Sequence, residues 1–345
     1  MSELPIWQYD SLLLILVLLF GITALAMQNL MGAAIVFGAY SFLMCLIWTT
    51  MGAVDVAFTE AAVGAGVSTV FIVSTIYNTG VSAIPKSPRI AFKIFASLIA
   101  IGTGAFLLSA LPDFPHWGDP KSPVNSIVAP YYIENSMKDA HVPNIVTTVL
   151  ADYRSFDTLL ETTVVFIACI AIYSILRIDN AKSKVTEPDI ITSPPAYDPT
   201  DSLIIRQASR IMVPFMQLFA LYVISHGHYS PGGGFQGGVI LAASIILICI
   251  SFDLKYVLQY WTEKKIMLLT ALGVLIFALV GLACTLMGGE YLNYGMLDSV
   301  LPGDKAYARS HGILLVEIGV GMTVMFSMIG IYINLASNGR FDRGL

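Results

Sequence analysis

The sequence predicts an all-α, polytopic membrane protein with about nine transmembrane helices. Hydrophobic residues make up 56% of its 345 residues, charged residues make up 12%, and the mean hydropathy is +0.76. Soluble globular proteins have about a quarter charged residues, so the composition excludes that class. Apolar runs of roughly 17 to 25 residues, long enough to cross a bilayer as a helix, recur along the chain. The nine candidate spans are residues 10–28, 30–50, 56–77, 90–111, 156–177, 211–226, 235–253, 266–287 and 311–335.

The distribution of basic residues predicts the orientation of these spans. Thirteen of the 18 Lys and Arg residues lie in the loops after the third, fifth and seventh spans and in the C-terminal tail. Because cytoplasmic loops carry the excess of Lys and Arg, we expect the N-terminus outside and the C-terminus in the cytoplasm. The opening residues MSELPIWQYD lack the positive region of a secretory signal, so we expect the first apolar run to remain as a span.

Two membrane blocks are expected, residues 1–179 with five spans and residues 203–345 with four. They are joined by a cytoplasmic linker at 180–202, whose Pro, Ser, Thr and charged residues are typical of solvated connections. Between the fourth and fifth spans, a proline-rich outer loop covers residues 112–154. We expect a short interfacial helix near 142–153 within this loop.

The four cysteines give no sign of a disulfide or an iron–sulfur site. All fall inside proposed spans, and none has CxxC or metal-ligand spacing. We interpret them as buried apolar residues. They are Cys45, Cys169, Cys249 and Cys284.

The ionisable residues in and beside the spans are the candidates for function. A carboxylate inside a membrane-spanning helix costs roughly 2.5 to 3.5 kcal/mol on insertion scales, so such a residue is by default a candidate ion or proton site. Acids and imidazoles without buried Lys or Arg favour cations or protons over anions. The candidate path residues are Asp55, Glu60, Asp157, Glu161, Glu317, His228 and His311, with Thr59, Thr158 and Thr162 as supporting hydroxyls and no metal ligands.

Spacing and topology predict where these acids meet. Asp157 and Glu161 are four residues apart, so they share one helix face and should point into the same groove. The third, fifth and ninth spans all run from outside to inside, and their acids lie near their starts. We therefore expect the acids to cluster in the outer half of the membrane, on a route that opens to the outer face. The structural alternative assigns Asp55 and Asp157 to helix dipoles and Glu60, Glu161 and Glu317 to interhelical hydrogen bonds.

The segment HGHYSPGGGFQGG, residues 226–238, matches GxGxxG but is not a dinucleotide site. That fingerprint needs a preceding strand in a βαβ unit, whereas membrane-length apolar runs flank this segment. We expect a tight re-entrant turn whose glycines let the backbone approach other helices. Small residues also predict close helix contacts at Ala62 and Gly66, at Gly64 and Ser68, and at Gly234, Gly238 and Ala242.

Three segments resemble known membrane proteins. GAVDVAFTEAAVGAG at 52–66 resembles a signature of the small D subunit of membrane-bound hydrogenases, equivalent to part of the C-terminal region of the Mrp antiporter A subunit. NIVTTVLADYRSFDTLLETTVVFIA at 144–168 is similar to the hydrogenase E subunit, and HGHYSPGGGFQGGVILA at 226–242 to the Mrp B subunit. The departures are modest, since Val54 replaces a usual proline and Leu160 a common glycine, while the acids are kept.

The resemblance implies a component of a multisubunit cation/proton antiporter in the cytoplasmic membrane of a prokaryote. The host complex would be a free-standing Mrp-type antiporter or the sodium-handling arm of a ferredoxin-linked hydrogenase or sulfane-reductase complex. Its partners would be other membrane subunits, including large antiporter-like subunits that rely on buried lysines, with lipid around them and no nucleic acid. Na⁺ and H⁺ would be the transported ions, with no cofactor bound.

Two functions from different classes follow. In the first, the buried acids form steps of a cation or proton path, with Glu60 and Glu161 as the leading residues. In the second, the chain is a structural spacer that joins larger pump subunits, and its acids serve only in interhelical bonds. A redox enzyme is a third possibility with little support, because cofactor and cluster motifs are lacking in the sequence.

Overall fold

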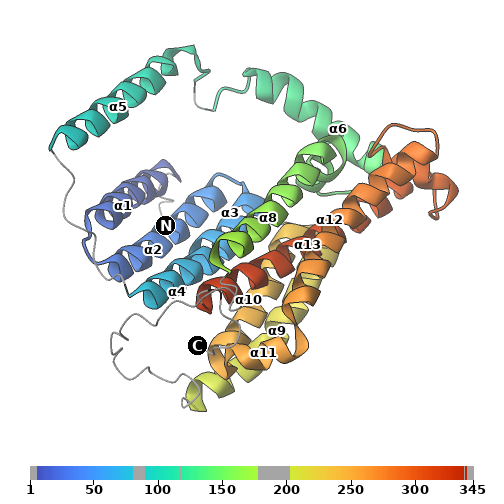
Figure 1. The fold of residues 1–345 in the computed structure, drawn as a ribbon. Helices are drawn as coiled ribbons and strands as arrows, with labels where there is room; N and C mark the ends of the chain where they lie inside the picture. Colours follow the sequence, from blue (N-terminus) through green and yellow to red (C-terminus); the bar gives the residue numbers. More distant parts are fainter. Residues whose placement is uncertain (1–5, 81–89, 117, 178–202, 338, 340–345) are drawn as a thin grey trace, which may run out of the picture.

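The protein is helical throughout the part that the computed structural model describes, which comprises residues 6–80, 90–116, 118–177, 203–337 and 339. Within these ranges there are no strands, and eight helices are long and apolar enough to cross a membrane. The apolar stretch Asp10–Ala26 of the first helix is shorter and accounts for the ninth predicted span. The predicted fold class is confirmed, and each predicted span overlaps a helix (Figure 1). The orientation of the termini and the linker at 180–202, which lies outside the described residues, stay predictions.

The first block contains five spans. The third span is continuous but changes its helical type, because a π-helix, η1, separates α3 from α4. The spans are α1 (Ile6–Ala26), α2 (Leu30–Thr50), α3 (Val54–Thr59) with η1 (Glu60–Ser68) and α4 (Thr69–Thr79), α5 (Ile90–Ser109), and α8 (Ser155–Leu176).

The loop between the fourth and fifth spans holds more helix than the sequence predicts. Short helices occur at η2 (Leu111–Asp113), η3 (Val124–Val128), α6 (Ala129–Ala140), α7 (Ile145–Thr148) and η4 (Val149–Tyr153). The last two form the helix expected near 142–153, whereas α6 was not predicted. It is amphipathic rather than uniformly apolar, so a search for membrane-length runs passes over it.

The second block contains four spans and two short helices. α9 runs from Leu203 to His226, and its neighbour α10 starts only eight residues later, at Gly234. The remaining elements are α10 (Gly234–Phe252), α11 (Leu254–Tyr260), α12 (Glu263–Leu286), η6 (Tyr294–Ser299) and α13 (Lys305–Ala336).

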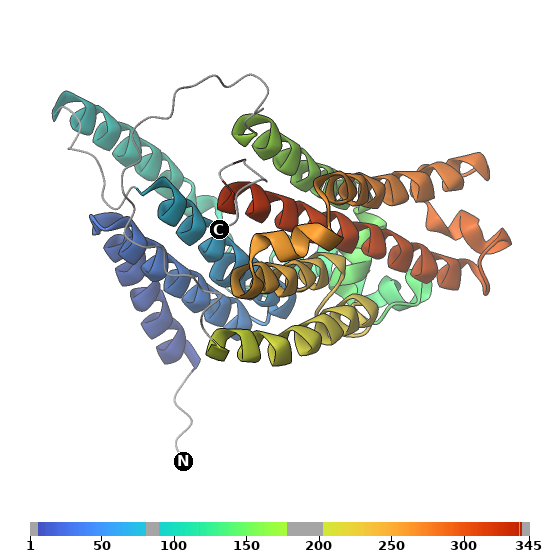
Figure 2. The same cartoon turned by 60° about the horizontal axis from the view of Figure 1, so that its bottom comes forward.

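The core is centred on α13, which packs against α8, α10 and α12 (Figures 1 and 2). Two-thirds of its apolar window is buried, whereas no residue in the corresponding window of α5 is. Fully buried side chains such as Phe277, Val316 and Ile329 fill the space between these helices. α13 is thus the element around which the two blocks are organised.

Small residues allow the closest helix contacts, as predicted for α10. A Cβ added at Gly234 would lie 2.1 Å from the backbone oxygen of Glu317, and one at Gly238 would lie 2.6 Å from the backbone oxygen of Gly321. In η1, a Cβ at Gly64 would approach Ser41 of α2. In a membrane the hydrophobic effect does not drive helices together, because lipid tails are as apolar as the side chains. Close packing at small residues is one of the interactions that associate helices there.

Candidate functional site

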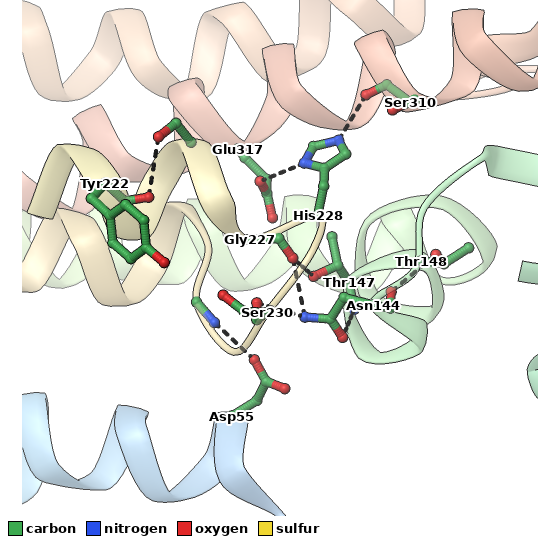
Figure 3. Close-up of polar contacts among 12 residues, drawn as sticks. Asp55, Asn144, Thr147, Thr148, Tyr222, Gly227, His228, Ser230, Ser310 and Glu317 are labelled. Carbon is green, nitrogen blue, oxygen red and sulfur yellow. Dashed lines mark hydrogen bonds and ion pairs between the residues drawn. The ribbon is translucent and has the colours of Figure 1, made fainter. Parts of the chain in front are cut away.

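The α9–α10 turn brings the second block against the third span. The backbone N–H of Gly232 donates to Asp55 Oδ1 at 3.0 Å, and Gln236 Nε2 donates to Thr59 Oγ1 at 3.0 Å (Figure 3 shows the Asp55 contact). Asp55 and Thr59 are four residues apart on one face of α3. A single face of α3 therefore contacts the C-terminal end of the glycine-rich turn and the start of α10.

The turn is tight, and its glycines are required by its geometry. Gly232 and Gly233 have φ angles of 158° and 131°, in the region that favours glycine. A Cβ at Gly232 would lie 2.8 Å from the carbonyl oxygen of Val223. On its other side, the carbonyl of Gly227 accepts hydrogen bonds from Asn144 Nδ2 at 3.0 Å and Thr147 Oγ1 at 2.7 Å. The predicted role of these glycines is confirmed.

Glu317 lies at the centre of the site, about three turns into α13. It is 8% exposed, and its Oε2 atom is buried without a hydrogen-bond partner in the described part of the chain. The Nδ1 atom of His228 lies 3.9 Å from Oε2 (Figure 3). A buried carboxylate oxygen that is left unbonded is costly, which points to a proton or a cation as its partner.

His228 belongs to the turn and faces Glu317 from outside the spans. Its Nε2 lies 3.0 Å from the carbonyl oxygen of Ser310. Because a carbonyl only accepts, Nε2 carries the hydrogen, and Nδ1 of the neutral ring is a lone pair directed toward Glu317. Burial lowers the pKa of His228, with a further lowering from His311 and an opposing effect of the Ser310 carbonyl. The neutral imidazole is therefore favoured.

A cavity of about 140 Å³ connects these elements. It brings together five of the predicted site residues from both blocks of the chain: Asp55, Thr59, Thr158, Glu161 and Glu317. The rest of its lining is the turn Gly232–Gly234 with Phe235 and Gln236, the short-helix residues Val146, Thr147, Leu150 and Ala151, and Val316 and Val320 of α13. Three of the five predicted acids, from the third, fifth and ninth spans, line this cavity, and their place in the outer half of the membrane stays a prediction.

Other predicted residues lie elsewhere. Asp157 is exposed and accepts a hydrogen bond from Arg154 Nε at 2.6 Å, and it is not part of the cavity lining, so the expectation that it shares a groove with Glu161 was wrong. Both acids are exposed on this chain, but only Glu161, one turn further along α8, lines the cavity. Glu60 is directed along η1 toward Gly64, away from the cavity.

The remaining candidates have structural contacts. Thr162 is buried and donates to the carbonyl of Thr158 at 2.7 Å. Thr158 itself donates to the carbonyl of Leu150 at 2.6 Å, which ties α8 to η4. His311 is on α13 close to His228 but is absent from the cavity lining.

Sequence reasoning missed several polar residues of this region. Gln236 could have been found, because an amide at the start of an apolar run is itself a signal. Asp152 and Arg309 looked like loop residues, yet they form a 2.9 Å ion pair in which Asp152 is buried. Burial raises the pKa of Asp152 even though the Arg309 guanidinium opposes that rise. Their pairing joins η4 to α13 and could be found only from tertiary structure.

Comparison with known families covers most of the chain. Residues 15–81 match the family of the D subunit of MBH, residues 93–189 match that of the E subunit of MBH, and residues 204–330 match the "Domain related to MnhB subunit of Na+/H+ antiporter". The B subunit of the Na(+)/H(+) antiporter of Bacillus subtilis is 31% identical over 132 residues, which is 36% of this chain and 92% of that protein. The chain belongs to the Mrp-type antiporter subunit family.

Solved structures agree with this assignment. The Mrp complex from Dietzia sp. DQ12-45-1b contains a chain that matches 93% of this one at 26% identity, with a TM-score of 0.67. This Mrp-type chain spans about a third (34%) of that longer chain. A chain of the archaeal membrane-bound sulfane sulfur reductase covers 70% of this chain, and 97% of its own length is matched, at 24% identity with a TM-score of 0.51, which shows a common fold. The Mrp-type chain is thus a multi-pass component of a prokaryotic membrane complex.

Proposed function

We propose that this chain supplies a binding step for a cation or proton inside a multisubunit Na⁺/H⁺ antiporter, at the cavity between α3, α8, α13 and the glycine-rich turn. The observation that carries the proposal is the buried, unbonded Oε2 of Glu317 in a cavity that two further acids also line. Had fixed neighbours saturated this oxygen, the acid would have a structural role only.

The chemistry of the lining suits exchange of Na⁺ for H⁺. Carboxylates of Glu317 and Asp55, hydroxyls of Thr59 and Thr158, and the Gln236 amide oxygen are hard oxygen ligands of the kind that hard cations prefer. A carboxylate that binds a cation cannot at the same time hold a proton. Competition at one oxygen therefore couples the two ions.

The acids form separate steps rather than one coordination sphere. In the described ranges, no three His, Cys, Asp or Glu side chains gather closely enough to hold a metal ion tightly. Asp55 is held by the Gly232 N–H, and Glu317 faces His228. Weak, successive sites are what conduction requires, since an ion must leave as well as enter.

The exposure of Glu161 indicates which face of this chain a partner subunit covers. It lines the cavity yet is exposed on the surface of this chain, about 9 Å along α8 from Ser155. A carboxylate at that depth cannot face lipid without a large cost. We infer that another membrane protein of the antiporter covers it, and that large antiporter-like subunits carry the remaining proton chemistry. Any redox centre would belong to other subunits.

The spacer function is favoured by one observation. The Asp55–Gly232 hydrogen bond joins the two blocks, so Asp55 has a structural role whatever else it does. The domain division at 180–202 belongs to this proposal as a joint between a hydrogenase-like part and an Mrp B-like part. The two functions differ in what the loss of a cavity carboxylate should do.

Glu161→Gln and its neighbour Asp157→Asn form a matched pair that tests the proposal. Both remove one charge from α8, one turn apart. We expect Glu161→Gln to lower Na⁺-driven proton movement in everted membrane vesicles by roughly ten-fold, as loss of a metal-site group does. Asp157→Asn should leave it unchanged, since an exposed ion pair contributes only about 0 to 1 kcal/mol.

Native gels of the same membranes separate the two functions. Intact complex with lost exchange supports the ion path. Loss of the complex in Glu161→Gln but not in Asp157→Asn supports the spacer, and equal exchange in both variants contradicts a role for Glu161 in the path.

A further inference from the structure

A second cavity lies outside the acid site and has the opposite charge. Its volume is about 310 Å³, and it is lined by residues from α6, the η6 region and the start of α13. Three cationic side chains, Lys138, Lys305 and Arg309, face it together with one acid, Asp139. The remaining lining residues are Asn293, Gly295, Met296 and Ala306. The net charge of the lining is therefore +2, from three cations and one acid.

Of the three cationic side chains of this cavity, Arg309 is held by polar partners, whereas the two lysines have no ion-pair partner in the described part of the chain. Arg309 is 29% exposed and is held by Asp152 at 2.9 Å and by Asn293 Oδ1 at 3.3 Å, which leaves three of its five N–H donors for another partner. Lys138 and Lys305 are exposed and have no ion-pair partner in the described part of the chain. The Asp139 carboxylate accepts a hydrogen bond from Tyr153 at 2.7 Å.

The length of α13 favours a position of the cavity at the depth of lipid headgroups. α13 has 32 residues, which makes it about 48 Å long against a hydrocarbon core of about 30 Å. Its polar start, Lys305–His311, must therefore project beyond the hydrocarbon. Tyrosines cluster beside the cavity, with the rings of Tyr132 and Tyr153 5.2 Å apart, as in the aromatic belts of membrane interfaces.

We propose that this basic cavity, formed by Lys138, Lys305 and Arg309, binds a phosphate group, and that the phosphate belongs to an anionic phospholipid of the surrounding membrane. The Arg309 guanidinium is oriented by Asp152, and its paired N–H donors match the spacing of phosphate oxygens. The ammonium groups of Lys138 and Lys305 add two positive charges that attract the phosphate. Basic pockets between transmembrane helices on the cytoplasmic or matrix side bind anionic headgroups, and we extend that chemistry to the opposite leaflet. The site is independent of the ion path, because no residue lines both cavities.

The test uses the assembled complex in lipid nanodiscs. In one arm, the phosphatidylcholine nanodiscs also contain phosphatidylglycerol; in the other arm, they contain no phosphatidylglycerol and inorganic phosphate is added. Native mass spectrometry measures the bound lipid, and thermal shift measures the stabilisation of the complex. We expect retention of phosphatidylglycerol to fall by at least about ten-fold in a Lys138→Gln, Lys305→Gln double variant. Lys138→Arg, Lys305→Arg should restore it, and Lys121→Gln, an outer-loop lysine outside the cavity, should not change it.

Each outcome decides between sources of the ligand. Phosphatidylglycerol retention that depends on the two lysines supports the lipid site, and neither glutamine change touches the Asp152–Arg309 pair that supports the fold. If inorganic phosphate stabilises the complex and phosphatidylglycerol is not retained over phosphatidylcholine, the cavity binds free phosphate. That result overturns the lipid assignment. Retention that is equal in wild type and the double variant overturns the site altogether.

Discussion

Glu317→Gln is expected to reduce cation-driven proton exchange to less than about a tenth of wild type while leaving the complex assembled. Glutamine keeps the shape of the side chain but neither takes up a proton nor balances a cation. Oε2 has no hydrogen-bond partner to lose in the described structure, so packing should be preserved. The measurement is Na⁺-induced collapse of a proton gradient in everted vesicles that carry the variant complex.

The control for Glu317→Gln is Glu317→Asp, which keeps the charge but withdraws it by one methylene. We expect partial exchange from Glu317→Asp, because the carboxylate still faces the cavity and His228. Undiminished exchange by an assembled Glu317→Gln complex would contradict the assignment. Failure of both variants to assemble would instead show that Glu317 serves the contact between α10 and α13.

Gly234→Ala is expected to prevent assembly or to destabilise the complex by about 3 kcal/mol or more, at the upper end of the cost of overpacking. The added Cβ would lie 2.1 Å from the Glu317 carbonyl oxygen and 3.1 Å from its Cα. Both neighbours are backbone atoms, so they can yield only if α10 and α13 separate. Thermal unfolding of the detergent-solubilised complex, followed by size-exclusion chromatography, measures this effect.

Gly102→Ala on α5 is the matched control for Gly234→Ala. Nothing lies within 4 Å of a Cβ placed at Gly102, and alanine is favoured over glycine in a helix interior by roughly 0.5 to 1 kcal/mol. The same substitution should therefore be neutral or slightly stabilising there. Equal melting temperatures for the two variants would show that the α10–α13 contact is looser than the geometry indicates.

The sequence was sufficient for the fold class and singled out several residues of the candidate cavity. Apolar runs of membrane length are an unambiguous signal, and each predicted span overlaps a helix of the described structure. The three acids Asp55, Glu161 and Glu317 were singled out because charge is costly inside a span, and all three line one cavity. The glycines of the α9–α10 turn were correctly predicted as positions of close backbone approach.

The finer arrangement depends on tertiary contacts that a one-dimensional pattern lacks. Asp157 and Glu161 share a face on an ideal helical wheel, but Asp157 pairs with Arg154 and does not line the cavity. Glu60 lies in a π-helix, where the residue spacing differs from 3.6 per turn, so its direction could not be read from the α-helical period. The Asp152–Arg309 pair links residues 157 positions apart. No sequence motif around either residue predicts this pairing.

Carbodiimide modification of the wild-type complex, read by peptide mass spectrometry at Glu317, tests the central claim most directly. A carbodiimide reacts with a protonated carboxyl group in apolar surroundings, so reaction reports a site that takes up a proton and can be reached. We predict that Glu317 is modified, that Na⁺ protects it in a concentration-dependent manner, and that exchange falls in parallel with modification. If Glu317 stays unmodified, or if Na⁺ does not change the extent of its modification, the assignment of this cavity to the ion path is contradicted.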